Sequence, residues 1–129
     1  MINIVISQTS TEPIYEQIKN QIKQQILAGT LKKGYALPSI RVLAKELNVS
    51  VITTKRAYEE LEKEGFIVTV PARGTFVADI DREKVSELGI QEIENDLKGI
   101  VKKAKIFGVD LQRLLETIER LYKGDEPLK

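Results

Sequence analysis

The chain has 129 residues, with 20 Lys and Arg against 19 Asp and Glu, and it contains no Cys, His or Trp. Without Cys there is no disulfide or thiolate nucleophile, and without His there is no Ser-His-Asp triad and no common type of zinc site. The sequence shows no Gly-rich phosphate-binding run, no apolar stretch of membrane-spanning length and no secretory signal. We therefore expect a cytoplasmic protein without metal or cofactor, built as one domain or as a small domain plus an attachment.

The charge is distributed unevenly along the chain. Residues 1–78 hold 10 Lys and Arg and 7 Asp and Glu, whereas residues 79–129 hold 10 and 12. The first part is mildly basic and the second mildly acidic. An excess of this size is weak evidence for nucleic-acid binding, because many DNA-binding domains are far more basic.

The N-terminal part begins with a predicted strand and a predicted helix. Residues 2–6 are rich in β-branched side chains and favour a short strand. Pro13 suits the start of a helix, and Gly29 suits its end. Isoleucines recur every four residues between them and give the helix one apolar stripe: Ile14, Ile18, Ile22 and Ile26.

Two short helices follow an ordered loop over residues 31–38. Ser39 and Ser50 are each placed to cap a helix, and Asn48 suits the left-handed turn between the two helices. The second helix carries one stripe, made of Thr54, Ala57, Tyr58 and Leu61, and ends at Gly65. This spacing predicts a helix-turn-helix, although ordinary helical hairpins look similar.

A β-hairpin is predicted next, from two β-rich runs at 66–70 and 75–78 around a Pro/Gly turn whose tip presents Arg73. Three helices followed by a hairpin form a winged helix-turn-helix. We therefore predict a mainly α fold with a small β-hairpin, in which residues 1–78 form the winged domain.

Residues 79–129 are predicted to form two amphipathic helices, separated at Gly108, with Asp110 as the second N-cap. Gly89 and Gly99 lie inside the first helix and indicate a kink or a close helix contact there. Two such helices bury their apolar faces poorly alone, which favours a two-fold homodimer. The predicted dimerisation residues are Ile93, Leu97, Ile100, Val101, Ala104, Leu111, Leu114, Leu115 and Ile118.

An ordered series of short motifs carries a family likeness, at residues 13–18, 26–31, 34–41, 43–50, 57–67 and 73–77. Over roughly residues 13–78 the chain resembles the GntR family of bacterial transcription regulators. The remaining residues resemble the short two-helix region of the YtrA-like subfamily. The resemblance implies a homodimer that binds double-stranded operator DNA, usually as a repressor, often of an operon encoding an ABC transporter.

The resemblance also implies DNA-binding residues in the two helices and in the wing. Val51 stands where many members have Arg, and Ala72 where many have Gly, so the operator and the wing are expected to differ from the usual pattern. The expected DNA-binding residues are Ser39, Arg41, Ser50, Val51, Thr53, Lys55, Arg56, Arg73, Gly74 and Thr75.

Each assignment has a plainer structural interpretation. Ile52, a second candidate for an apolar base contact, could belong to the core. Arg41 could pair with Glu46 or another carboxylate, and Lys55 and Arg56 could pair with Glu59 and Glu60 at i+4. Arg73 could be an exposed turn charge. The acidic residues are expected to be solvated helix faces and not a metal or acid–base site. The alternative functions are a winged helix for protein–protein contact and a small enzyme or ligand-binding module. Whether an effector binds at the dimer interface stays open.

Overall fold

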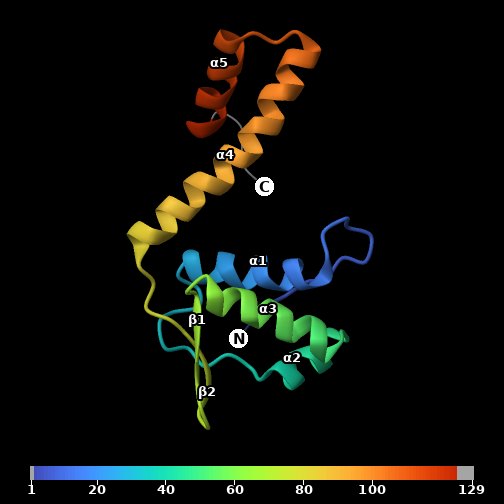
Figure 1. The fold of residues 1–129 in the computed structure, drawn as a ribbon, viewed down its shortest axis with the longest axis vertical. Coiled ribbons are helices and arrows are strands. Elements are labelled where there is room, and N and C mark those ends of the chain that lie inside the picture. The colour runs from blue at the N-terminus through green and yellow to red at the C-terminus, as the bar shows by residue number, and fades with distance from the viewer. Residues whose placement is uncertain (1, 125–129) are drawn as a thin grey trace. The chain divides into compact units, whose positions relative to one another are not determined.

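The computed structural model describes residues 2–124. The elements run α1 (Ile14–Leu27), α2 (Ile40–Leu47), α3 (Val51–Lys63), β1 (Ile67–Val70), β2 (Gly74–Val77), α4 (Arg82–Phe107) and α5 (Leu111–Tyr122) (Figure 1). The chain divides between Ile80 and Asp81 into two compact units. No helix within residues 2–124 is both long enough and apolar enough to cross a membrane.

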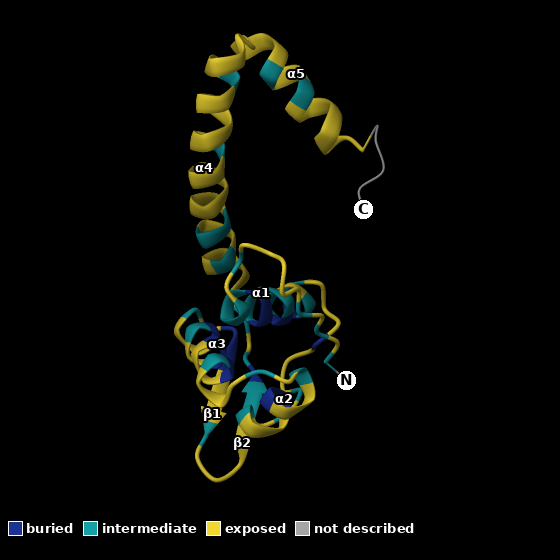
Figure 2. Ribbon diagram, turned by 90° about the vertical axis from the view of Figure 1, so that its right-hand side faces the viewer, coloured by how far each residue is buried: buried dark blue, intermediate teal, exposed yellow. Residues whose placement is uncertain are grey.

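The first unit is built around α3, which packs against α1 on one side and α2 on the other. The apolar stripe of α1 faces this core, as the four-residue spacing predicts. Figure 2 shows the buried residues concentrated where the three helices meet. The largest fully buried side chains are Phe66, Ile18, Ile22, Leu43, Leu61 and Thr54.

The predicted helix-turn-helix is confirmed, caps included. Ser39 Oγ accepts a hydrogen bond from the Val42 N–H at 3.2 Å, and Ser50 Oγ accepts one from the Thr53 N–H at 3.0 Å. Between the helices, Asn48 adopts the left-handed conformation with φ of 56°. These local interactions fix both helix starts and the turn between them.

The hairpin forms the wing, with β1 antiparallel to β2 and Ile67 opposite Val77. The loop before α2 is joined to it by a β-bridge between Ala36 and Phe76, and the Leu37 N–H donates to the Thr75 carbonyl at 2.9 Å. The wing and the loop that leads into α2 are therefore one connected layer.

The predicted strand at residues 2–6 is wrong, because this segment forms no strand. A strand needs a neighbouring strand to bond its backbone, and α1 lies there instead. Side-chain amides on α1 replace that neighbour. At 2.7–3.0 Å, the amides of Gln17, Gln21 and Gln25 bond to the backbone of Ser7, Val5 and Asn3, respectively.

The second unit consists of α4 and α5. Asp81 caps α4 through the N–H groups of Glu83 and Lys84, Gly108 ends it with φ of 73°, and Asp110 caps α5 at 2.8 Å from the Arg113 N–H. The helix continues through Gly89 and Gly99, and a Cβ at either would meet nothing within 4 Å, so neither glycine makes a close helix contact within the described chain. Neither α4 nor α5 contains a buried residue, and the two helices splay apart (Figure 2).

Candidate nucleic-acid interface

The first turn of α3 exposes two apolar side chains. Val51 is 42% exposed and Ile52 is 80% exposed, so the assignment of Ile52 to the core is wrong. The buried face of α3 begins at Thr54, whose hydroxyl donates to the Ser50 carbonyl at 3.1 Å. The sequence stripe located that buried face but could not show how far Ile52 projects from it.

The two hydroxyls at this helix start are bonded to each other. Ser50 Oγ donates to Thr53 Oγ1 at 2.7 Å and also accepts the Thr53 N–H. The helix N-terminus adds the partial positive charge of its free N–H groups. Phosphate or base-edge contacts are the chemistry that this arrangement offers.

Two exposed cations lie on the helices of the helix-turn-helix. Arg41 lies in the first turn of α2 and Lys55 on α3, and both are exposed. Neither forms an ion pair with any carboxylate of the described residues, so the predicted alternatives, pairing of Arg41 with Glu46 and of Lys55 with Glu59, do not occur there. A guanidinium that is free to turn outward can bind a guanine edge or a phosphate through two nitrogens.

Arg56 is held differently from Lys55. Its guanidinium carbon lies 3.9 Å from the centroid of the Tyr15 ring on α1. This stacking joins α3 to α1 while leaving the guanidinium edge able to donate hydrogen bonds. Arg56 therefore contributes to helix packing whether or not it reaches DNA. Aromatic spacing in the sequence gave no signal for this contact.

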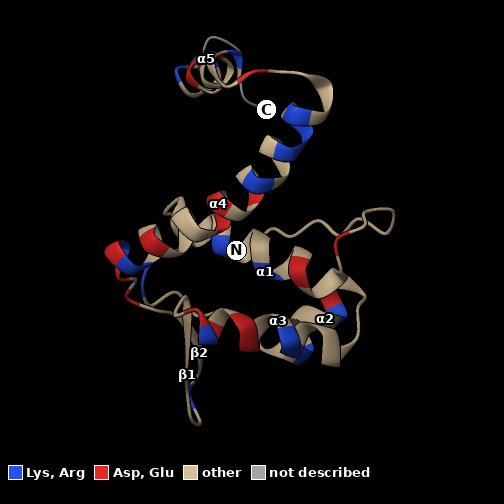
Figure 3. Ribbon diagram, turned by 45° about the horizontal axis from the view of Figure 1, so that its top comes forward, with Lys and Arg blue, Asp and Glu red and all other residues tan. Residues whose placement is uncertain are grey.

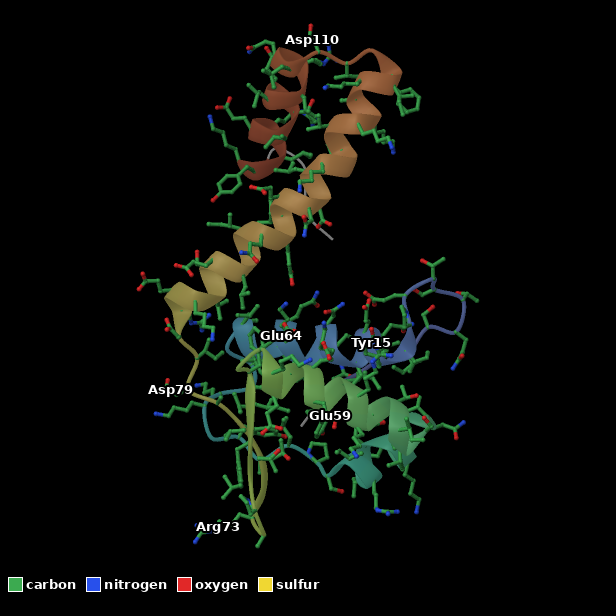
Figure 4. All side chains as sticks on the ribbon, in the orientation of Figure 1. Tyr15, Glu59, Glu64, Arg73, Asp79 and Asp110 are labelled. Atoms are coloured by element: carbon green, nitrogen blue, oxygen red, sulfur yellow. The ribbon has the colours of Figure 1, made fainter. Side chains whose placement is uncertain are left out.

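The wing turn carries the fourth cation, Arg73, and a strained residue. The Arg73 N–H donates to the Val70 carbonyl at 3.0 Å, and Ala72 at the third turn position has φ of 65°, as in a type II turn. Figure 4 shows Arg73 at the tip of the hairpin. At the start of β2, Gly74 has φ of 121°, and Thr75 Oγ1 lies 3.3 Å from Thr69 Oγ1 across the ladder.

Two anchors hold α3 in place behind this surface. The Tyr58 hydroxyl donates to the Pro38 carbonyl at 2.7 Å, which ties α3 to the loop entering α2. Burial, with a smaller contribution from the nearby Glu46 carboxylate, raises the Tyr58 pKa well above its usual range. At the other end of α3, Glu64 pairs with Lys19 and Lys23 of α1 at 3.2 and 3.4 Å. The side chains of Tyr58, Glu64, Lys19 and Lys23 lie on or beside the core, so both ends of α3 are tied to neighbouring elements.

Apolar side chains on the second unit remain uncovered. Of the nine predicted dimerisation residues, Leu97, Ala104 and Leu114 are half-buried, and the other six are 40–69% exposed. A groove of about 310 Å³ opens between α4 and α5. The prediction omitted further exposed apolar residues here, which their helical spacing could have indicated: Ile90, Ile106, Phe107, Val109, Leu121 and Tyr122.

Comparison with known proteins extends over nearly the whole chain. The model of the bacterial regulatory proteins of the gntR family matches residues 14–77. The HTH-type transcriptional repressor YtrA of Bacillus subtilis (strain 168) is 38% identical over 118 residues, which is 92% of this chain and 91% of the relative. The matched family and this relative are transcription regulators and not enzymes.

Two solved structures are also similar. The GntR-family transcription factor YtrA from Sulfolobus acidocaldarius is 40% identical, with a TM-score of 0.59 over 71% of this chain and 97% of that one. The DNA-binding domain of AraR in complex with operator ORX1 is 26% identical, with a TM-score of 0.53 over 60% of this chain and 96% of that one. The predicted winged helix-turn-helix fold is thereby confirmed.

Proposed function

Because the chain belongs to the GntR family of bacterial regulatory proteins, in its YtrA-like subfamily, we propose that it is a homodimeric repressor that binds an inverted-repeat operator. The observation that carries the proposal is the first turn of α3. There an isoleucine that is 80% exposed stands beside a bonded pair of hydroxyls. Lys55 on the same helix and Arg41 in the first turn of α2 have no carboxylate partner in the described chain.

In this proposal the first turn of α3 enters the major groove. Val51 and Ile52 contact thymine methyl groups, and Thr53 bonds to a base edge or a phosphate. Apolar contacts replace the reading of guanine that an arginine at position 51 would supply. The operator is therefore expected to carry A·T pairs opposite this turn.

The surrounding polar groups position the protein on the duplex. Lys55 and the edge of the Arg56 guanidinium bind phosphates, and Arg41 binds a guanine or a phosphate. Ser39 and Ser50 add hydroxyls at their helix starts. The wing contributes Arg73, Gly74 and Thr75 to the backbone or the minor groove.

The second unit supplies the two-fold symmetry. Residues 79–129 act as the dimerisation region and residues 1–78 as the DNA-binding domain. The uncovered apolar surface of α4 and α5, which a second copy would bury, supports this assignment. We assign repression because the B. subtilis relative is named a repressor. An ABC transporter operon, which the YtrA-like resemblance implies, is the proposed target class. The site of action is the cytoplasm, where the operator DNA lies.

Selection of bound duplexes from a random pool by the purified full chain tests this function. We expect an enriched inverted repeat whose binding weakens steeply with salt. Arg41→Ala should weaken binding to that sequence, whereas Lys63→Ala, which changes an exposed cation at the far end of α3, should leave the binding unchanged. Binding without an enriched sequence, or without dependence on salt, would overturn the proposal in favour of a winged helix that contacts protein.

A further inference from the structure

The apolar side chains of α4 follow a heptad pattern. None of them is buried in a core of the single chain. Their intervals alternate between three and four residues, which produces one straight seam along a helix. All six are exposed or half-buried, and Phe107 reaches 73% exposure. The seam consists of Ile90, Ile93, Leu97, Ile100, Ala104 and Phe107.

Charge is segregated along the same helix. Residues 87–96 hold four carboxylates and no Lys or Arg, whereas residues 98–105 hold four lysines and no Asp or Glu. Figure 3 shows this change from acidic to basic along α4. Two copies of α4 side by side in parallel would place like charges together. An antiparallel arrangement would place each acidic half beside a basic half.

The groove between α4 and α5 lies on the basic half. Ile100, Ala104 and Phe107 of the seam line it together with Lys103, and Leu114 of α5 lies on its opposite side. An antiparallel partner would bring the start of its own seam, Ile90 and Ile93, to this opening. A parallel partner would bring its lysine-rich half there instead, next to Lys103.

From these observations we infer that α4 pairs antiparallel with α4 of a second copy, so that each copy's acidic half fills the groove on its partner's basic half. This inference rests on the proposed homodimer and specifies its geometry. In a heptad pairing of this kind Ile93 lies opposite the partner's Ala104, and Leu97 lies opposite the partner's Ile100. The two-fold axis then passes near the middle of the seam.

Asp96 and Lys103 flank the seam on the same side, because each precedes an inward-facing residue by one position. They lie seven residues apart, about 10 Å along the helix, which is too far for an ion pair within one chain. In the antiparallel pairing Asp96 lies opposite the partner's Lys103, and symmetry repeats the pair. Both side chains are exposed and have no hydrogen-bond or ion-pair partner within residues 2–124.

Charge reversal in the full chain tests this pairing, with dimer dissociation measured by analytical ultracentrifugation. Asp96→Lys alone and Lys103→Asp alone should each weaken the dimer about ten-fold or more, since each reversal creates two repulsive contacts. The double variant Asp96→Lys/Lys103→Asp should restore wild-type affinity. Circular dichroism checks that each variant remains folded. Single variants that dimerise like wild type, or a double variant that is no better than either single variant, would overturn the antiparallel pairing.

Cysteine cross-linking provides the geometric control, because the natural chain contains no cysteine. Ile93→Cys and Ala104→Cys proteins should form disulfides when mixed and neither should do so alone. Self-cross-linking of each variant would indicate a parallel dimer and would contradict the inference while leaving the homodimer intact. A wild-type chain that stays monomeric at high concentration would instead contradict the homodimer itself.

Discussion

The Arg56 guanidinium stacks on the Tyr15 ring, at 3.9 Å from its centroid, and thereby joins α3 to α1. The Tyr15 hydroxyl donates to the neighbouring Glu16 carboxylate at 3.2 Å. Arg56 therefore contacts the face of the Tyr15 ring, while the hydroxyl bonds to another residue. A residue that supplies charge to the helix proposed to enter the DNA groove is thus also part of the packing that fixes that helix.

Replacement of Tyr15 should separate the contribution of the aromatic face from that of the hydroxyl. We expect Tyr15→Leu to lower the free energy of unfolding by about 1–2 kcal/mol, because the cation–π contact and part of the ring packing are lost. Tyr15→Phe should stay near wild type in urea denaturation. Equal losses in both variants would show that the stacking contributes nothing.

Replacement of Ile52 should affect DNA binding and leave the fold intact. Because the side chain is 80% exposed, Ile52→Ala should change the free energy of unfolding by less than about 0.5 kcal/mol. Its operator affinity should fall by about five-fold, through loss of an apolar base contact. Fluorescence anisotropy on labelled duplex measures this. Val5→Ala, a change at another exposed apolar residue, is the control and should bind like wild type.

Two lysines on α3 form a matched pair for salt dependence. Lys55→Ala should reduce the slope of log affinity against log salt by about one, because one phosphate contact is removed. Lys63 lies at the opposite end of the helix, with its ammonium 3.7 Å from Glu60. Lys63→Ala should leave the slope unchanged. An equal decrease of the slope in both variants would contradict a specific contact between Lys55 and a phosphate.

The wing turn should respond in opposite directions to two substitutions. Ala72→Gly relieves a left-handed conformation that costs roughly 1 kcal/mol, but it also raises the conformational entropy of the unfolded chain. The free energy of unfolding should stay the same or rise by up to about 1 kcal/mol. Gly74→Ala, at φ of 121°, should lower it by about 1–2 kcal/mol. Thermal denaturation measures both; destabilisation by Ala72→Gly would show that the strain has been overestimated.

Tyr58 should make stability depend on pH at the alkaline end. Its pKa is raised in the folded state, so the unfolded chain loses this proton first and stability falls as the pH rises above the ordinary tyrosine value of 10.0. Tyr58→Phe should cost about 1–2 kcal/mol at about pH 8, since the Pro38 carbonyl loses its donor. The difference between the two proteins should shrink at about pH 10.5 in urea denaturation. A constant difference would contradict the raised pKa.

Features that depend on near neighbours in the chain were predictable from the sequence. Ser39, Ser50 and Asp110 cap their helices, and Asn48 turns the chain, because each acts on residues within one helical turn. The predicted strand at residues 2–6 was wrong because a strand depends on a partner distant in sequence. A side-chain stripe could not reveal the exposure of Ile52 or the contact between Arg56 and Tyr15, since both depend on how α1 and α3 pack.

The attachment of the N-terminal segment to α1 has a consequence for sequence variation. Gln17, Gln21 and Gln25 bond to main-chain atoms, and the side chains of the residues they hold are exposed. The attachment therefore depends on the position of the backbone and not on which side chains residues 3, 5 and 7 carry. We therefore expect residues 3, 5 and 7 to vary more among related chains than the three glutamines, which lie one helical turn apart.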